Sequence, residues 1–130
     1  TSIAQGWEQI FPHEFGQGLG FDVLETNDGG YVMVGDIDYP TGAIRHYVRL
    51  VKTDNNGNPM WSHIYNDGAI GYQTGRSILE NADGGFIIAG TSNNQGMIMH
   101  TDMTGDSLWT KLYGDDGQFQ FNAIVENGDG

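Results

Sequence analysis

The sequence predicts an all-β fold made of repeated four-stranded antiparallel meanders. The first observation is a segment that occurs twice, "ETNDGGYVMVG" at 25–35 and "ENADGGFIIAG" at 80–90. The second is a motif that follows each copy, "KTDNNGNPMWSHIY" at 52–65 and "HTDMTGDSLWTKLY" at 100–113. The third is that no segment shows a helical period with capping residues. Helices are therefore expected to be few or absent.

The first motif predicts a hairpin followed by a buried strand. Asp28-Gly29 and Asp83-Gly84 are typical of two-residue hairpins, because a primed turn requires positive φ at both positions and Asp-Gly tolerates it. The apolar runs at 31–34 and 86–89 are too short for helices and suit a strand that is covered on both faces.

The second motif predicts an outer strand, because large side chains alternate along it. Its tail also occurs near the start of the chain, as "GWEQIF" at 6–11. One face of this strand carries Trp61, His63 and Tyr65 in the first copy and Trp109, Lys111 and Tyr113 in the second.

Each unit is therefore expected to contain four strands. We expect the first strand at 22–26 and 77–81, the second at 30–35 and 86–91, the third at 47–53 and 97–102, and the fourth at 59–65 and 107–113. Four-stranded units with a period of 46–55 residues and two buried faces are typical of β-propeller blades. The predicted organisation over 1–130 is a partial β-propeller with two complete blades, 20–65 and 75–113. We expect an outer strand of a preceding blade at 1–11 and an inner strand of a following blade at 121–130.

The two motifs, in this order, resemble the DGG-type propeller repeats of secreted and surface proteins of bacteria and archaea. "DGGYVMVG" followed by "VKTDNNGNPMW", and "DGGFIIAG" followed by "TDMTGDSLW", carry the resemblance. It implies the propeller fold and an extracellular role in adhesion, scaffolding or substrate binding. Fold alone does not assign an activity.

Propellers close with about four to eight blades, so two blades predict that these residues are a segment of a longer propeller chain. The expected partners are the remaining blades of the same propeller or neighbouring subunits. A native mass near 14 kDa would contradict this prediction.

Charge and composition limit which other classes of partner the chain can bind. The chain has 17 acidic and 5 basic residues and a net charge of −12, which repels nucleic acid and anionic membranes. It lacks cysteine, which excludes disulfides and thiol chemistry. No apolar run is long enough to predict membrane insertion. Protein or glycan ligands remain, and the acidic balance favours an extracellular or cell-surface location.

The connections that differ between the copies are the candidate recognition face, since binding residues favour loops on a rigid scaffold. Segment 36–46 is expected to form a loop seven residues longer than its counterpart. The alternative is that these are variable solvent loops. The candidate binding residues are Asp36, Asp38, Tyr39, Arg45, His46 and Tyr72.

Two further patterns supply candidate ligands for calcium. In the third-to-fourth-strand turns, oxygen-bearing residues are spaced two apart, although glycine comes fourth and the acid of an EF-type loop is missing. A turn with a left-handed glycine and an Asp bonded to the backbone explains the same residues. Acids also recur on each first strand, where a ring of carboxylates could hold a cation or a polar strand end could simply precede a hairpin. The candidates are Asp54, Asn56, Asn58, Asp102 and Asp106 in the turns, and Glu25, Glu80 and Glu126 on the strands.

Catalytic signatures are missing from the sequence. The four histidines share no metal-ligand spacing, and there is no Gly-x-Ser-x-Gly elbow. The expected function is non-enzymatic binding or scaffolding, with no cofactor beyond the possible calcium. The alternative is the substrate-binding propeller part of a secreted enzyme that acts on glycans or peptides.

Overall fold

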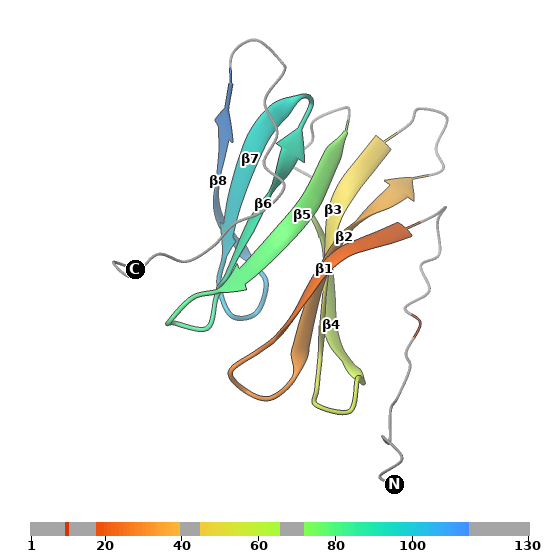
Figure 1. Ribbon diagram of the computed structural model, residues 1–130, viewed down its shortest axis with the longest axis vertical. Helices are drawn as coiled ribbons and strands as arrows, with labels where there is room; N and C mark the ends of the chain where they lie inside the picture. Colours follow the sequence, from red (N-terminus) through yellow and green to blue (C-terminus); the bar gives the residue numbers. More distant parts are fainter. Residues whose placement is uncertain (1–9, 11–17, 40–44, 66–71, 115–130) are drawn as a thin grey trace, which may run out of the picture.

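The computed structural model (Figure 1) describes residues 10, 18–39, 45–65 and 72–114. The strands are β1 (Gly18–Glu25), β2 (Tyr31–Tyr39), β3 (Arg45–Thr53), β4 (Pro59–Tyr65), β5 (Gln73–Glu80), β6 (Phe86–Ser92), β7 (Gln95–Thr101) and β8 (Ser107–Tyr113). They form two four-stranded antiparallel sheets, β1 to β4 and β5 to β8, each in sequence order. The predicted all-β fold with two repeated meanders is therefore confirmed. None of the described residues forms a helix that could cross a membrane. The predicted flanking strands at 1–11 and 121–130 fall, apart from Ile10, outside the described residues.

The Asp-Gly-Gly corners form a longer turn than predicted. The Thr26 N–H donates to the Gly30 carbonyl at 2.8 Å, and the Gly29 N–H donates to the Thr26 carbonyl at 2.9 Å, which closes a three-residue loop. Gly29 has a φ of 85°, whereas Asp28 does not have a positive φ. The second copy repeats both hydrogen bonds and the positive φ. The prediction of a two-residue turn is wrong, because the Asp28 carboxylate accepts the Gly30 N–H at 3.0 Å and stabilises the longer loop.

A two-residue turn occurs elsewhere, between β6 and β7. Asn93 and Asn94 have φ values of 47° and 70°, and the flanking residues Ser92 and Gln95 are paired. Positive φ at both central positions is the property of a primed turn, which asparagine tolerates better than most residues.

The last glycine of each repeated motif faces a bulge in the first strand. β1 is irregular between Gly20 and Asp22, and β5 is irregular at the equivalent place. Gly35 pairs with Gly20, and a Cβ added at Gly35 would lie 1.9 Å from the Leu19 carbonyl oxygen. The equivalent Gly90 has the same relation to Thr74. Glycine is therefore required where the bulged strand approaches its partner.

Strands β2 and β3 extend into the segment that was expected to be a loop. The ladder continues through the pairs Asp36 with Val48 and Asp38 with His46. Ile37, between the two acids, is completely buried on the opposite face. The loop prediction for 36–46 is therefore wrong at 36–39 and 45–46, because strand alternation continues through the polar residues. The first strands also begin earlier than expected, since each continues past its bulge.

The two sheets stack face to face and share one apolar core. β5 contacts β1, β2 and β3, so it is the strand of the second sheet that lies against the first (Figure 1). Gly75 allows the close approach, because a Cβ there would lie 2.5 Å from Val34 Cγ2. Burying these side chains stabilises the fold by roughly 1.5–3 kcal/mol for each large one. The core consists of Val32, Val34, Val48, Leu50, Ile78, Phe86, Ile88, Met97 and Met99.

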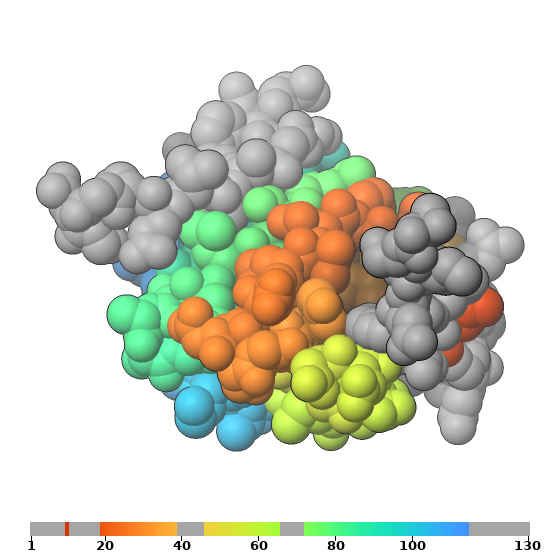
Figure 2. All heavy atoms as spheres, turned by 60° about the horizontal axis from the view of Figure 1, so that its bottom comes forward, coloured from red at the N-terminus to blue at the C-terminus, as the bar shows by residue number. Residues whose placement is uncertain are grey.

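The antiparallel order places the repeated turns at one end of both sheets. These turns cover 26–30, 54–58, 81–85 and 102–106, and they gather on one surface in Figure 2, where this end comes forward. At the opposite end, β2 and β6 end and β3 and β7 begin. The connections between these strands differ between the two copies.

Candidate functional site

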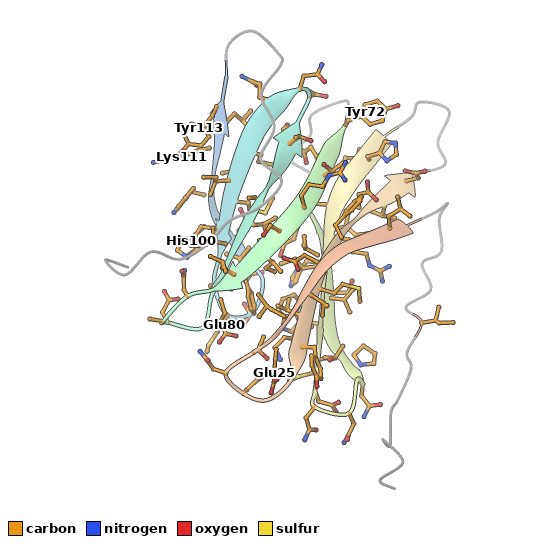
Figure 3. The ribbon with its side chains drawn as sticks, viewed as in Figure 1. Glu25, Tyr72, Glu80, His100, Lys111 and Tyr113 are labelled. Carbon is orange, nitrogen blue, oxygen red and sulfur yellow. The ribbon has the colours of Figure 1, made fainter. Side chains whose placement is uncertain are left out.

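Four of the six predicted binding residues come together at the end where the connections differ. Asp36, Asp38, His46 and Tyr72 are called the rim cluster below. The first three share the face of the first sheet that meets the second sheet, and Tyr72 precedes β5 of the second sheet. Tyr72 lies at the opposite end of the molecule from Glu25 (Figure 3). The cluster therefore spans the junction of the two sheets, away from the repeated turns.

Strand register brings the two acids to the histidine. Asp38 and His46 are directly opposite each other on β2 and β3, and Asp36 lies one same-face position further along β2. His46 Nδ1 lies 2.5 Å from Asp38 Oδ1 and 3.9 Å from Asp36 Oδ2. This nitrogen is buried and has no hydrogen-bond partner among the described residues, and its contact with Asp38 is an ion pair when His46 is protonated.

Backbone pairing and stacking hold Tyr72 over this group. Tyr72 forms a parallel bridge with His46, and their rings stack with centroids 4.5 Å apart and an interplanar angle of 21°. The Tyr72 N–H donates to Asn93 Oδ1 at 3.0 Å, and the Asn93 N–H donates to the Tyr72 carbonyl at 2.8 Å. The aromatic ring is thus fixed by its own backbone and by the β6–β7 turn.

The two carboxylates of the rim cluster have different environments. The Asp36 side chain is 8% exposed, and this burial raises its pKa. A protonated His46 opposes the shift, the nearby Asp38 carboxylate adds to it, and the Leu19 N–H and the Arg76 guanidinium oppose it. The Asp38 side chain is 43% exposed, so it presents a carboxylate to solvent.

This arrangement offers a ligand two kinds of contact. Tyr72 is 49% exposed and presents an aromatic surface next to His46, which the Asp38 carboxylate also contacts. A carboxylate accepts strong hydrogen bonds from ammonium, guanidinium and hydroxyl groups, and an aromatic face packs against a cation or an apolar surface. The rim cluster is therefore suited to cationic or hydroxyl-rich groups and is unfavourable to anions.

The two other predicted binding residues lie next to the cluster. Tyr39 and Arg45 are paired across the ends of β2 and β3, immediately beyond Asp38 and His46. Their side chains and the connection at 40–44 lie outside the described part.

The acids of the third-to-fourth-strand turns are bonded to their own turns. Asp54 Oδ1 accepts the N–H groups of Asn56 and Asn58, both at 2.9 Å, and Asp102 Oδ1 accepts those of Thr104 and Asp106, also at 2.9 Å. The Asn58 hydrogen bonds lower the pKa of Asp54, and the Thr104 hydroxyl makes the largest contribution to lowering the pKa of Asp102. These contacts are those of an Asx turn. Calcium binding here stays a prediction, and the part of the chain that the structure describes contains no group of three or more acids and histidines arranged to hold a metal.

The recurring glutamates differ in their surroundings. Glu80 Oε1 accepts the Asn27 N–H of the first sheet at 2.9 Å, so Glu80 joins the two sheets. Glu25 is exposed, and Glu126 lies outside the described residues. A ring of these carboxylates therefore also stays a prediction.

Two kinds of structural contact were not predicted from the sequence. Asn93 positions Tyr72, and the Asn-Asn pair between two strands was the signal for its turn. Asp22 Oδ2 accepts the Ile78 N–H at 3.0 Å and joins the sheets. Nothing in the sequence marks Asp22, because its role depends on how the sheets stack.

No protein-family model matches this chain, and no curated protein matches it in sequence.

Proposed function

We propose that the chain is a non-enzymatic binding and scaffolding module of a secreted or surface protein, built from DGG-type propeller blades. The repeated motifs support the blade assignment, and the stacking of two four-stranded meanders is compatible with it. The rim cluster is the proposed recognition site.

The position of the rim cluster supports its role as the recognition site. The end of the sheets where the copies differ is also the end where two acids, a histidine and a tyrosine converge on the junction of the sheets. The exposed Asp38 carboxylate and Tyr72 ring would bind a protein or glycan that presents ammonium or hydroxyl groups.

The experiment uses an array of neutral and amine-bearing glycans and a lysine-rich peptide as probes. Asp38→Asn and Tyr72→Ala should each weaken binding roughly tenfold, because each removes a contact worth about 1.5 kcal/mol. The matched control is Asp83→Asn, an exposed acid among the repeated turns, which should leave the affinity unchanged. Equal loss in all three variants, or no binding to any probe, would contradict the proposed site.

A second candidate function rests on the raised pKa of Asp36. Two carboxylates in unequal environments beside a histidine are a pattern used for acid–base chemistry. The substrate-binding part of a secreted enzyme acting on glycans or peptides is therefore the alternative. Hydrolysis of such substrates that Asp36→Asn abolishes would favour it over the binding module.

A further inference from the structure

His46 contacts the same two groups of the rim cluster that the proposed function assigns to a ligand. Its Nδ1 lies 2.5 Å from Asp38 Oδ1, and its ring stacks on Tyr72 with centroids 4.5 Å apart. Asp38 is the exposed carboxylate of the cluster, and Tyr72 is its exposed aromatic ring. A charge on His46 therefore acts at both positions where a ligand would bind.

The contact between His46 and Asp38 depends on protonation. Nδ1 is buried and has no hydrogen-bond partner among the described residues. A protonated imidazole forms an ion pair with Asp38, and its charge lies over the Tyr72 ring, where a cation–π interaction is favourable. A neutral imidazole makes neither interaction. Since imidazoles change their charge between about pH 5 and 8, the cluster changes its charge in the same range.

The other charged groups near His46 belong to β2 and β5. Asp36 Oδ2 on β2 lies 3.9 Å from His46 Nδ1, and burial raises the pKa of this carboxylate. Arg76 on β5 is exposed, and its guanidinium acts electrostatically on Asp36. Guanidinium groups and phenols do not titrate between about pH 5 and 8, so Arg76 and Tyr72 keep their charge there. Protonation of Asp36 or of His46 would make the cluster less negative, so an experiment has to separate these two residues.

A lysine side chain fits the two exposed groups of the cluster. Its ammonium group pairs with a carboxylate such as Asp38, and its four-carbon stem packs on an aromatic ring such as Tyr72. The net charge of −12 also attracts basic proteins over a longer range. A neutral glycan gains nothing from this charge. The charge distribution therefore favours a lysine-rich protein segment over a neutral glycan.

We propose that the rim cluster binds a lysine-rich segment of a partner protein while His46 is neutral and releases it when His46 becomes protonated. This inference rests on the proposed function. The imidazolium neutralises the Asp38 carboxylate and repels the incoming ammonium group. As the pH falls from about 8 to 5, the affinity should fall roughly tenfold, which corresponds to about 1.4 kcal/mol. Because the effect is reciprocal, binding of the segment should displace a proton from His46.

The probe is a lysine-rich peptide with an acetylated N-terminus. Lysine ammonium groups keep their charge between about pH 5 and 8, whereas an α-amino group does not. Fluorescence anisotropy of the labelled peptide measures its Kd with the intact chain at the two pH values. Calorimetry at about pH 6.5, in two buffers with different enthalpies of ionisation, should show that binding releases a fraction of one proton. The same peptide with acetylated lysines should not bind at either pH.

Two substitutions at His46 separate the histidine from the other groups. His46→Phe retains a ring that can stack on Tyr72, and His46→Gln retains a polar side chain, so either variant can serve if the other fails to fold. Each should bind the peptide at low pH about as tightly as at high pH and should release no proton on binding. The matched control is His100→Gln on β7, away from Tyr72 (Figure 3), which should keep the roughly tenfold change.

Two results would overturn this proposal and leave the proposed function intact. One is an equal affinity at both pH values in the unchanged chain, together with weaker binding in Asp38→Asn. The other is a roughly tenfold loss at low pH that persists in His46→Phe and His46→Gln, since it would assign the titration to Asp36. If neither the peptide nor any glycan binds at high pH, both this proposal and the proposed function are wrong.

Discussion

Replacing Gly35 or Gly90 by alanine is expected to lower the free energy of unfolding by more than about 3 kcal/mol or to prevent folding. An added Cβ would lie 1.9 Å from a backbone carbonyl oxygen of the facing strand, Leu19 for Gly35 and Thr74 for Gly90. The obstructing atom belongs to a paired strand next to a bulge, so it cannot move without breaking the ladder. Urea unfolding followed by tryptophan fluorescence measures the loss.

Gly29→Ala is the matched control for this prediction. Gly29 has a φ of 85°, and an added Cβ would meet nothing within 4 Å, so only the left-handed conformation penalises alanine there. The expected cost is about 1 kcal/mol. Equal costs at Gly29 and Gly35 would contradict the close approach at the bulge.

Removing the Asp28 carboxylate is expected to lower the free energy of unfolding by about 2 kcal/mol. Lys52 is 5% exposed, and its Nζ lies 3.1 Å and 3.0 Å from the Asp28 oxygens and 2.9 Å from the Thr53 carbonyl. Asp28→Ala removes this carboxylate from a buried ammonium that keeps its hydrogen bond to the Thr53 carbonyl. Because the Asp28 side chain is 57% exposed, the cost should be lower than for a fully buried pair.

The second repeat provides the control for this substitution. Asp83 accepts the Gly85 N–H at 3.0 Å as Asp28 accepts that of Gly30, but His100 stands in the place of Lys52. Asp83→Ala should therefore cost only the turn hydrogen bond, about 1 kcal/mol. A loss at Asp83 as large as that at Asp28 would show that the ion pair contributes little.

The same pair predicts how stability depends on pH. The Thr26 hydroxyl, the Gly30 N–H and Lys52 lower the pKa of Asp28 from 3.8 to about 2. A lowered pKa means that the contribution of Asp28 is complete above pH 3.8 and is lost as the pH falls to about 2. Urea unfolding across this range should show a smaller acid-induced loss for Asp28→Ala than for the unchanged chain.

The repeated motifs predicted the strands but not every turn. Recurrence of the Asp-Gly-Gly and Trp motifs was sufficient for two four-stranded meanders, because each unit carries its own hairpin signals. Asp-Gly is compatible with both the two-residue and the three-residue loop, and the hydrogen bonds between Thr26 and Gly30 decided between them. Segment 36–46 was expected to be a loop because it is seven residues longer than its counterpart in the second copy. The strand conformation of its two ends depends on the pairing of β2 with β3.

Comparing the copies selected the candidate site, but only the structure gave its geometry. Asp36, Asp38, His46 and Tyr72 were chosen because the connections there differ. The sequence contains no information on the register that places Asp38 opposite His46, or on the sheet stacking that brings Tyr72 over the histidine ring. Asp22 was not predicted for the same reason, because its partner, the Ile78 N–H, belongs to the other sheet.

The rim cluster depends on the stacking of the two sheets, because His46 belongs to the first sheet and Tyr72 precedes β5 of the second. Methyl NOE spectroscopy of the intact chain tests it most directly, because Val34, Val48 and Ile88 converge on Gly75. The structure predicts strong NOEs from the methyl groups of Val34 and Val48 in the first sheet to those of Ile88 in the second. Methyl NOEs confined to pairs within one sheet would contradict the account.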